Sequence, residues 1–296
     1  MPVHTPVLTK EVLEYLDPKP GENFIDGTVG EGGHAILLLE KTSPDGKLLG
    51  IDLDSDQINN CSEKIKQFAE RAVLVNDSYA NIKKIIEREK FSPNGILLDL
   101  GMSSWQLEGS EKGFSFQKDQ KLDMRYDLNT NELTAGEIVN EWPEPQIEEI
   151  LREYGEEKFS RQIAKKICEE REAEKIETTF QLLEIVGSAV PERFKRGKIH
   201  YATRTFQALR IAVNSELENI KKALPEIISV LSPGGRAVII SFHSLEDRIV
   251  KNFFRDKAKE GTVKLLTKKP VTAGTEEIEQ NPRSRSAKLR AIEKIT

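Results

Sequence analysis

Four short apolar segments of the sequence each end in an aspartate. They are residues 24–26, 49–52, 73–77 and 96–99, and their last residues are Asp26, Asp52, Asp77 and Asp99. A single aspartate at such a place is usually only a turn or helix-capping residue. Ligands of open parallel sheets bind beyond the carboxyl ends of the strands, so four aspartates at one sheet edge favour a shared polar pocket.

A glycine-rich segment follows the first aspartate. Residues 26–34 read Asp-Gly-Thr-Val-Gly-Glu-Gly-Gly-His and precede an apolar helical pattern. Glycines allow a tight turn and a close approach of ligand to backbone, and the backbone N–H of His34 at the helix start is available to a ligand. Asp52 stands about where a carboxylate accepts hydrogen bonds from ribose hydroxyls. These features predict a nucleoside-containing cofactor.

Charge distinguishes the candidate cofactors. Residues 26–56 contain seven acidic residues and only two lysines. This neighbourhood would repel a pyrophosphate, whereas S-adenosylmethionine carries a sulfonium, an ammonium and a single carboxylate. The sequence contains no G-x-x-x-x-G-K-[ST] segment for a phosphate-binding loop. S-adenosylmethionine is therefore favoured, and NAD remains the alternative.

The spacing of the four aspartates predicts the elements that position them. Successive aspartates are 26, 25 and 22 residues apart, which suits one strand, one helix and two loops. Helical patterns cover 34–41, 56–70 and 81–89, and the next convincing strand is 236–242. We therefore expect an α/β fold in which a parallel sheet carries an inserted helical domain. The expected domains are 1–108 and 207–296 for the sheet and 109–206 for the insert.

The insert and the C-terminal region have their own patterns. Residues 103–131 read as a loop, followed by helices at 145–154, 157–175 and 178–190, the last with a Thr178/Gln181 capping box. Residues 203–231 stay helical, with Pro225 expected to start a new helix. Ser244 and Asp247 resemble a cap for the helix 245–259. Strands at 262–266 and 286–295, separated by a loop, predict an antiparallel edge with one solvated face.

Composition excludes several classes of protein. No apolar run approaches the roughly 20 residues of a membrane span. Residues 1–18 lack the pattern of a secretion signal, and two cysteines are too few for a disulfide framework, which favours a cytoplasmic protein. The four histidines lack metal-ligand spacing, so we expect no catalytic metal.

The net charge of -5 hides a local basic cluster. Residues 193–204 contain five cationic and no acidic residues, and a second group of four cations lies at 283–290. A basic surface on an acidic protein indicates a selective polyanion partner, although such runs are often merely solvated. The candidate RNA contacts are Arg193, Arg196, Lys198 and Arg204.

Several motifs together resemble the bacterial small-subunit ribosomal RNA cytosine-N4 methyltransferases. They occupy 27–34, 99–107, 112–116, 122–125, 154–157, 202–211, 241–248 and 281–290, so that the resemblance spans nearly the whole chain. The resemblance implies that the α/β fold is a Rossmann-like S-adenosylmethionine-dependent methyltransferase sheet with an inserted helical domain. It further implies methyl transfer from S-adenosylmethionine to the exocyclic amine of a cytidine near the decoding centre. It also implies that small-subunit ribosomal RNA, or the assembling 30S particle, is the partner.

The resemblance also implies roles for individual residues. The implied cofactor contacts are Gly32, Gly33, His34, Asp52, Tyr79, Asp99 and Gln106. Hydrogen-bond acceptors that could assist the cytosine amine are Asp99, Ser103, Ser104 and Ser241, and none is singled out as a catalytic base. An unstacked base could rest on Trp105, Phe114, Phe116 or Tyr201.

Three aromatic residues depart from the usual family pattern. Tyr201 and Trp105 stand where the family usually has proline, and Tyr79 stands where phenylalanine is common. Two other functions remain open on the residues alone. These are an NAD-dependent oxidoreductase and a noncatalytic nucleotide-sensing RNA-binding protein.

Overall fold

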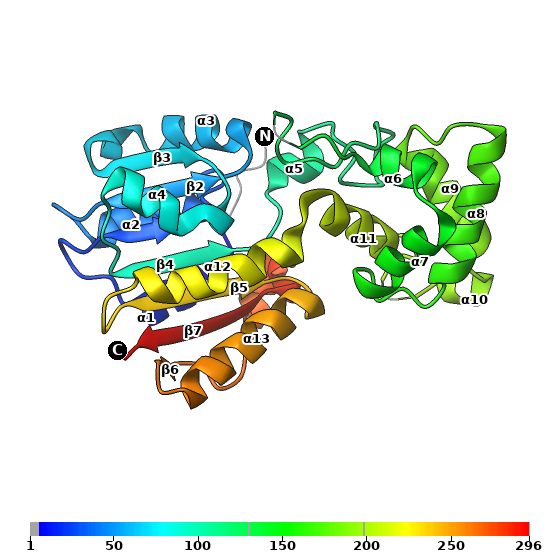
Figure 1. The fold of residues 1–296 in the computed structure, drawn as a ribbon. Coiled ribbons are helices and arrows are strands. Elements are labelled where there is room, and N and C mark those ends of the chain that lie inside the picture. The colour runs from blue at the N-terminus through cyan, green and yellow to red at the C-terminus, as the bar shows by residue number, and fades with distance from the viewer. Residues whose placement is uncertain (1–5, 130, 198, 296) are drawn as a thin grey trace. The chain divides into compact units, whose positions relative to one another are not determined.

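The computed structural model describes residues 6–129, 131–197 and 199–295. The chain forms two compact units (Figure 1). Met1–Gly101 and Leu217–Thr296 form the first unit, and Met102–Glu216 forms the second. The insert predicted at 109–206 lies inside the second unit.

The first unit contains a seven-stranded sheet, which confirms the predicted α/β class. The strand order is β3-β2-β1-β4-β5-β7-β6. The strands are β1 (Phe24–Asp26), β2 (Leu48–Asp52), β3 (Ala72–Asn76), β4 (Gly95–Asp99), β5 (Arg236–Ser241), β6 (Val263–Leu265) and β7 (Lys288–Lys294). Strands β1 to β5 are parallel, and β7 is antiparallel to both β5 and β6. The strand order reverses between β1 and β4, which is where open parallel sheets bind ligands.

Helices accompany this sheet because its central strands are apolar on both faces. In chain order they are α1 (Thr9–Leu16), α2 (Gly33–Lys41), α3 (Ser55–Lys64), α4 (Ile82–Glu89), α12 (Glu216–Val230), α13 (Ser244–Lys259) and α14 (Thr275–Gln280). Three short 3-10 helices complete the unit: η1 (Lys66–Arg71), η2 (Tyr79–Asn81) and η3 (Pro282–Ser286). In the described part of the chain, no helix is both long and apolar enough to cross a membrane.

The structure corrects two expectations about these helices. The pattern 56–70 is not one helix, because α3 ends at Lys64 and η1 follows. Pro225 lies inside α12 rather than starting a new helix. Buried Leu224 and Ile227 flank the proline, and their packing maintains the helix across it. The chain breaks earlier, at Ser215, which has a φ of 50°.

The cap of α13 also differs from the prediction. His243 is the N-cap, and it forms a capping box with Glu246, one residue before the predicted Ser244/Asp247 pair. The Asp247 carboxylate instead accepts a hydrogen bond from the Arg290 guanidinium at 2.7 Å. Arg290 is therefore a buried, paired residue and not part of an exposed C-terminal basic group.

The C-terminal strands have a different environment from the one expected. β7 lies between β5 and β6, and its central residues are buried, so it has no solvated face. β6 forms the edge instead. The connection predicted as a loop contains α14 and η3.

The second unit is helical, as predicted. Its helices are α5 (Ser104–Glu108), α6 (Ala135–Glu141), α7 (Glu144–Glu153), α8 (Ser160–Ala173), α9 (Thr179–Ala189), α10 (Glu192–Lys195) and α11 (Thr203–Asn214). The capping box of Thr178 and Gln181 is present at α9. α5 interrupts the predicted loop 103–131, because Ser103 and Gln106 form a capping box of their own. Met102 and Leu107 pack on the core of this unit, so α5 belongs with the inserted helices.

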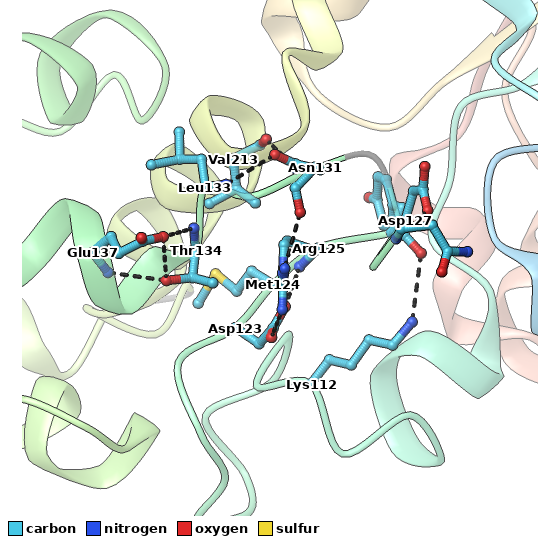
Figure 2. Close-up of polar contacts among 12 residues, drawn as sticks. Lys112, Asp123, Met124, Arg125, Asp127, Asn131, Leu133, Thr134, Glu137 and Val213 are labelled. Carbon is cyan, nitrogen blue, oxygen red and sulfur yellow. Dashed lines mark hydrogen bonds and ion pairs between the residues drawn. The ribbon is translucent and has the colours of Figure 1, made fainter.

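Polar contacts fasten the segment before α6 to α11 (Figure 2). The Arg125 guanidinium donates to both carboxylate oxygens of Asp123 at 2.9 and 2.7 Å, and to the Asn131 carbonyl at 2.9 Å. The Asn131 amide donates to the Val213 carbonyl at 2.8 Å. These contacts hold an irregular segment in place, and Met124 in this segment is fully buried.

Candidate functional site

The loop between β1 and α2 lies at the carboxyl edge of the sheet, between the ends of β2 and β4. In the sheet register, Asp26 pairs with Gly50 on one side and with Leu97 on the other. β2 and β4 therefore each extend two residues beyond the end of β1. The Gly27 and Val29 amides donate to the Leu97 and Ile51 carbonyls, both at 2.9 Å, and hold the loop in this gap. Asp52 and Asp99, the last residues of β2 and β4, consequently flank the glycine loop.

The Asp52 carboxylate is bound to the glycine loop. One oxygen accepts a hydrogen bond from the Gly30 amide at 2.9 Å, and the other accepts from the Asp54 amide at 2.9 Å. Burial raises the pKa of Asp52 to about 7, with smaller contributions from the nearby charges of Asp54 and Asp26. The two backbone donors oppose this rise, so the carboxylate is positioned by hydrogen bonds that favour its charged form.

Asp26 and Thr28 tie the start of the loop to β4. Asp26 is almost fully buried, and burial raises its pKa to about 6. One of its oxygens accepts from the Thr28 amide at 3.2 Å. The Thr28 hydroxyl oxygen in turn accepts from the Asp99 amide at 2.6 Å. Thr28 was not singled out from the sequence, although its place inside the glycine segment was a signal for it.

The His34 imidazole is buried in this site. Its Nε2 atom lies 3.6 Å from the Asp99 Oδ2 atom, which is an ion-pair distance rather than a hydrogen bond. Neither ring nitrogen of His34 has a hydrogen-bond partner among the described residues. The sequence drew attention to the backbone N–H of His34, whereas the structure places the ring itself beside the carboxylates. Buried polar atoms without partners suit a bound polar ligand.

Packing explains two of the predicted glycines. Gly32 has a φ of 85°, and a Cβ atom there would lie 2.9 Å from the Cys61 Sγ atom. A Cβ atom on Gly33 would lie 2.9 Å from the Pro6 Cγ atom. A Cβ atom on either residue would collide with protein, so packing requires both glycines and the positive φ further requires Gly32.

Tyr79 and Asp77 follow β3 and have different environments. Tyr79 is half-buried, and its Cβ atom would lie 3.4 Å from a Cβ atom added to Gly27, so it borders the glycine loop. The Asp77 carboxylate accepts hydrogen bonds from the Ser78 amide at 2.7 Å and from the Asn81 side chain at 2.8 Å. Asp77 therefore caps its own turn, and the other three aspartates surround the loop.

The proposed acceptor residues are distributed over both units. In the first unit, Ser241 is buried, and its hydroxyl donates to the Lys288 carbonyl at 3.4 Å. In the second unit, the Ser103 hydroxyl accepts from the Gln106 amide, and the Gln106 side-chain oxygen accepts from the Ser103 amide, both at 3.1 Å. Ser104 is the first residue of α5, and its side chain lies outside the described part of the structure.

The basic cluster lies in the second unit around α10. Arg193 and Arg196 are exposed, and the Arg193 guanidinium lies 4.9 Å from the centre of the Phe194 ring. Arg204 donates to the Glu156 carbonyl. Lys198 lies outside the described residues. This surface therefore combines cations with an exposed aromatic ring.

His200 and Tyr201 lie within the segment 193–204 and contact other aromatic rings. Phe116 stacks on His200 with ring centres 4.6 Å apart, and His200 lies 4.2 Å from Tyr201. His200 is exposed, whereas Phe114 is buried and stacks on Tyr126 at 5.3 Å. Phe114 is therefore a core residue and not a platform for a base. The sequence analysis did not single out His200, which adjoins the predicted Tyr201.

Comparison with known proteins gives a consistent result over the whole length. The model of the MraW methylase family matches residues 1–295. The ribosomal RNA small subunit methyltransferase H of Kosmotoga olearia is 47% identical over 297 residues, covering 99% of this chain and 97% of that protein. The protein of the same name from Persephonella marina is 47% identical over 293 residues and covers 99% of both chains.

A solved structure supports the fold. The crystal structure of a proposed rRNA methylase from Clostridium thermocellum aligns with a TM-score of 0.51 and 13% identity. The alignment covers 99% of this chain and 100% of that one. At this identity the match bears on the arrangement of the elements alone.

Proposed function

The chain belongs to the MraW methylase family, and from this premise we propose that it methylates the exocyclic N4 amine of a cytidine in small-subunit ribosomal RNA. S-adenosylmethionine is the methyl donor. The observation that carries the proposal is a group of three carboxylates at the glycine loop, those of Asp26, Asp52 and Asp99. The His34 imidazole lies beside Asp99 and has no hydrogen-bond partner among the described residues.

The charge of the donor fits this arrangement. Burial raises the pKa values of Asp26 and Asp52 to about 6 and 7, which means that their negative charges are poorly solvated. A cationic ligand favours the ionised forms and relieves this cost. A pyrophosphate would increase the cost, because it brings more negative charge to the same place. The site therefore favours S-adenosylmethionine over NAD.

Each residue has a proposed part in holding the donor. A carboxylate offers about four acceptor sites, and the amides of Gly30 and Asp54 use two at Asp52, which leaves two for the ribose hydroxyls. Tyr79 offers a ring face to the adenine. Asp99 and Gln106 are proposed to bind polar atoms at the adenine end. The segment Gly32, Gly33 and His34 is proposed to bind the amino-acid end.

The protein contributes mainly alignment to the reaction. When bound, S-adenosylmethionine would supply an electrophilic methyl group, and the electron pair of the broken carbon–sulfur bond would stay on sulfur. The cytosine amine would form the new nitrogen–carbon bond and release a proton. The cytosine amine is a weak nucleophile, so a nearby acceptor helps it to release that proton. The candidates are Asp99, Ser103, Ser104 and Ser241. Asp99 is the only carboxylate among these four, and its side chain is 16% exposed.

We assign RNA binding to the second unit. Arg193 and Arg196 are proposed to contact phosphates, together with Arg204 and Lys198. The exposed ring of His200, supported by Phe116, offers a stacking surface for an unpaired base. The proposed substrate is free small-subunit RNA or the assembling 30S particle, and the proposed location is the cytoplasm.

Methyl transfer from a tritiated donor tests the function. Small-subunit RNA and 30S particles from cells lacking this protein are incubated with the purified chain and labelled S-adenosylmethionine. We expect label in one cytidine, identified as N4-methylated by mass mapping. Retention of the RNA without labelling would indicate a noncatalytic binding protein, and displacement of the donor by NAD would favour an oxidoreductase.

A further inference from the structure

A second cationic site lies on the first unit, where α13 meets the edge of the sheet. A pocket of about 240 Å³ is lined by Lys251, Phe254, Arg255, Leu265, Thr267, Lys268 and Arg290. These residues come from α13, β6, the segment after β6, and β7. Figure 1 shows α13 running beside β6 and β7. The pocket shares no lining residue with the glycine-loop site of the same unit.

The exposed charged side chains that line this pocket are all cationic. Lys251 and Lys268 are exposed, and neither has an ion-pair partner among the described residues. Arg255 pairs with Asp256 at 3.0 Å, but both side chains are about half exposed, and such pairs are weak. Arg290 is neutralised by Asp247 in the wall of the pocket. Three cationic side chains are thus available to an incoming anion.

The surrounding sequence strengthens this charge. Residues 248–269 contain eight lysines and arginines and only two acidic residues. Lys251 and Arg255 are four residues apart on α13, so they project from one face of the helix. The floor beneath them is apolar, since Phe254 is buried and Leu265 is half-buried. A sugar or base can contact such a floor while its phosphates face the cations.

The size and position of the pocket favour a segment of a longer polyanion. Its volume lies below the roughly 300 to 1,000 Å³ of sites that enclose a whole small ligand. Lys251 is seven residues into a helix that begins directly after the carboxyl edge of β5, which places it about 10 Å along the axis from that edge. One or two nucleotides of a strand that reaches the edge could occupy it.

We infer that this pocket binds the phosphodiester backbone of the substrate RNA and so gives the first unit an RNA contact of its own. The inference rests on the proposed function for its choice of polyanion. Lys251, Arg255 and Lys268 bind phosphates, and Phe254 and Leu265 form the apolar floor. The contact carries no sequence information and fixes the register of the RNA on the protein.

Salt-dependent RNA binding tests the inference. The triple variant Lys251→Gln, Arg255→Gln, Lys268→Gln is compared with the wild type by fluorescence anisotropy on a labelled small-subunit RNA fragment. Each lost phosphate contact on a single strand reduces the slope of log affinity against log salt by about 0.7 units, so the expected reduction is about 2. The KM for RNA should rise about tenfold or more, with kcat at saturating RNA unchanged.

A matched control removes the same charge elsewhere on the first unit. Lys66, Lys84 and Lys90 are exposed and lie outside the pocket, and the triple change of these residues to Gln should leave the slope within about half a unit of the wild type. An unchanged slope for the pocket variant, or an equal reduction in the control, would overturn the inference. Stronger competition by polyglutamate than by RNA of equal charge would also overturn it, in favour of an acidic protein partner.

The two proposals fail in different ways. If the wild type methylates RNA and the pocket variant binds it normally, only the phosphate contact is wrong. If the wild type binds RNA without methylating it, the proposed function fails while the slope still reports on the pocket. Thermal unfolding of both triple variants by circular dichroism confirms that the comparison is made on folded protein.

Discussion

The Asp52 carboxylate accepts a hydrogen bond from the amide of Gly30, 22 residues earlier in the chain, at 2.9 Å. This contact joins the end of β2 to the glycine loop after β1. It positions one carboxylate oxygen on the loop and leaves further acceptor sites on the same group for a ligand. The geometry of the loop and the affinity for the donor are therefore coupled through one side chain.

Replacing Asp52 by alanine should weaken the binding of S-adenosylmethionine by about ten- to a hundredfold, because charge-assisted hydrogen bonds to the ribose are lost. Isothermal titration calorimetry measures the effect. Asp45→Ala removes an exposed acid from the same unit and should leave the affinity unchanged. Wild-type affinity in the Asp52 variant would remove this residue from the site.

The affinity for adenosine should depend on pH through Asp52. Burial raises the pKa of this carboxyl to about 7, and only the ionised form is a full acceptor for the ribose hydroxyls. Binding should therefore weaken as the pH falls through 7 and be about tenfold weaker at pH 6 than at pH 8. Adenosine is the suitable probe because it does not titrate in this range. Asp52→Asn should abolish the dependence, and a persistent slope in that variant would assign the titration elsewhere.

Asp26 should reduce the stability of the protein as the pH rises. Burial raises its folded-state pKa to about 6, above the unfolded value of roughly 3.9, so the native state loses stability between these two values. Asp26→Asn cannot ionise and avoids this loss. The free energy of unfolding by urea should be higher for this variant than for the wild type by an amount that grows by on the order of 1 kcal/mol between pH 5 and pH 8. An advantage independent of pH would contradict this account.

Gly32→Ala should destabilise the protein by about 2 to 4 kcal/mol, because the residue has a φ of 85° and its new Cβ atom would lie 2.9 Å from the Cys61 Sγ atom. Urea unfolding provides the measurement. Gly274→Ala is the control, since it meets no atom within 4 Å and has no positive φ, and it should change stability by less than about 0.5 kcal/mol. Equal effects of the two changes would argue against tight packing at Gly32.

Arg193→Gln and Arg196→Gln should each reduce the salt slope of RNA binding by about 0.7 to 1 unit, for single-stranded and double-stranded contacts respectively, because both side chains are exposed on the basic cluster. Arg204→Gln should have a smaller effect, since its guanidinium already donates to the Glu156 carbonyl. The control is Lys165→Gln, an exposed residue of α8 paired with Glu169. A slope unaffected by the changes at Arg193 and Arg196 would exclude this cluster from the RNA interface.

The sequence alone determined the strands of the parallel sheet, most of the long helices and the edge of the sheet at which the four aspartates lie. Apolar segments ending in aspartate, spaced by the length of a helix and two loops, identified the parallel strands β1 to β4. The long gap before β5 identified the helical insert. These features are local, because hydrophobic periodicity, turn residues and caps act within a few neighbouring residues. The same local rules failed at Pro225, where the packing of flanking apolar residues outweighs the preference of proline for the first turn of a helix.

The tertiary structure alone decided which of these residues meet. β2 and β4 each extend two residues beyond the end of β1, and this brings Asp52 and Asp99 to the glycine loop. Asp77 instead caps its own turn. The burial of the His34 ring beside Asp99 and the pocket formed by Lys251, Arg255 and Lys268 likewise depend on register and packing between distant segments. Such contacts join residues far apart in the chain, so no local pattern in the sequence specifies them.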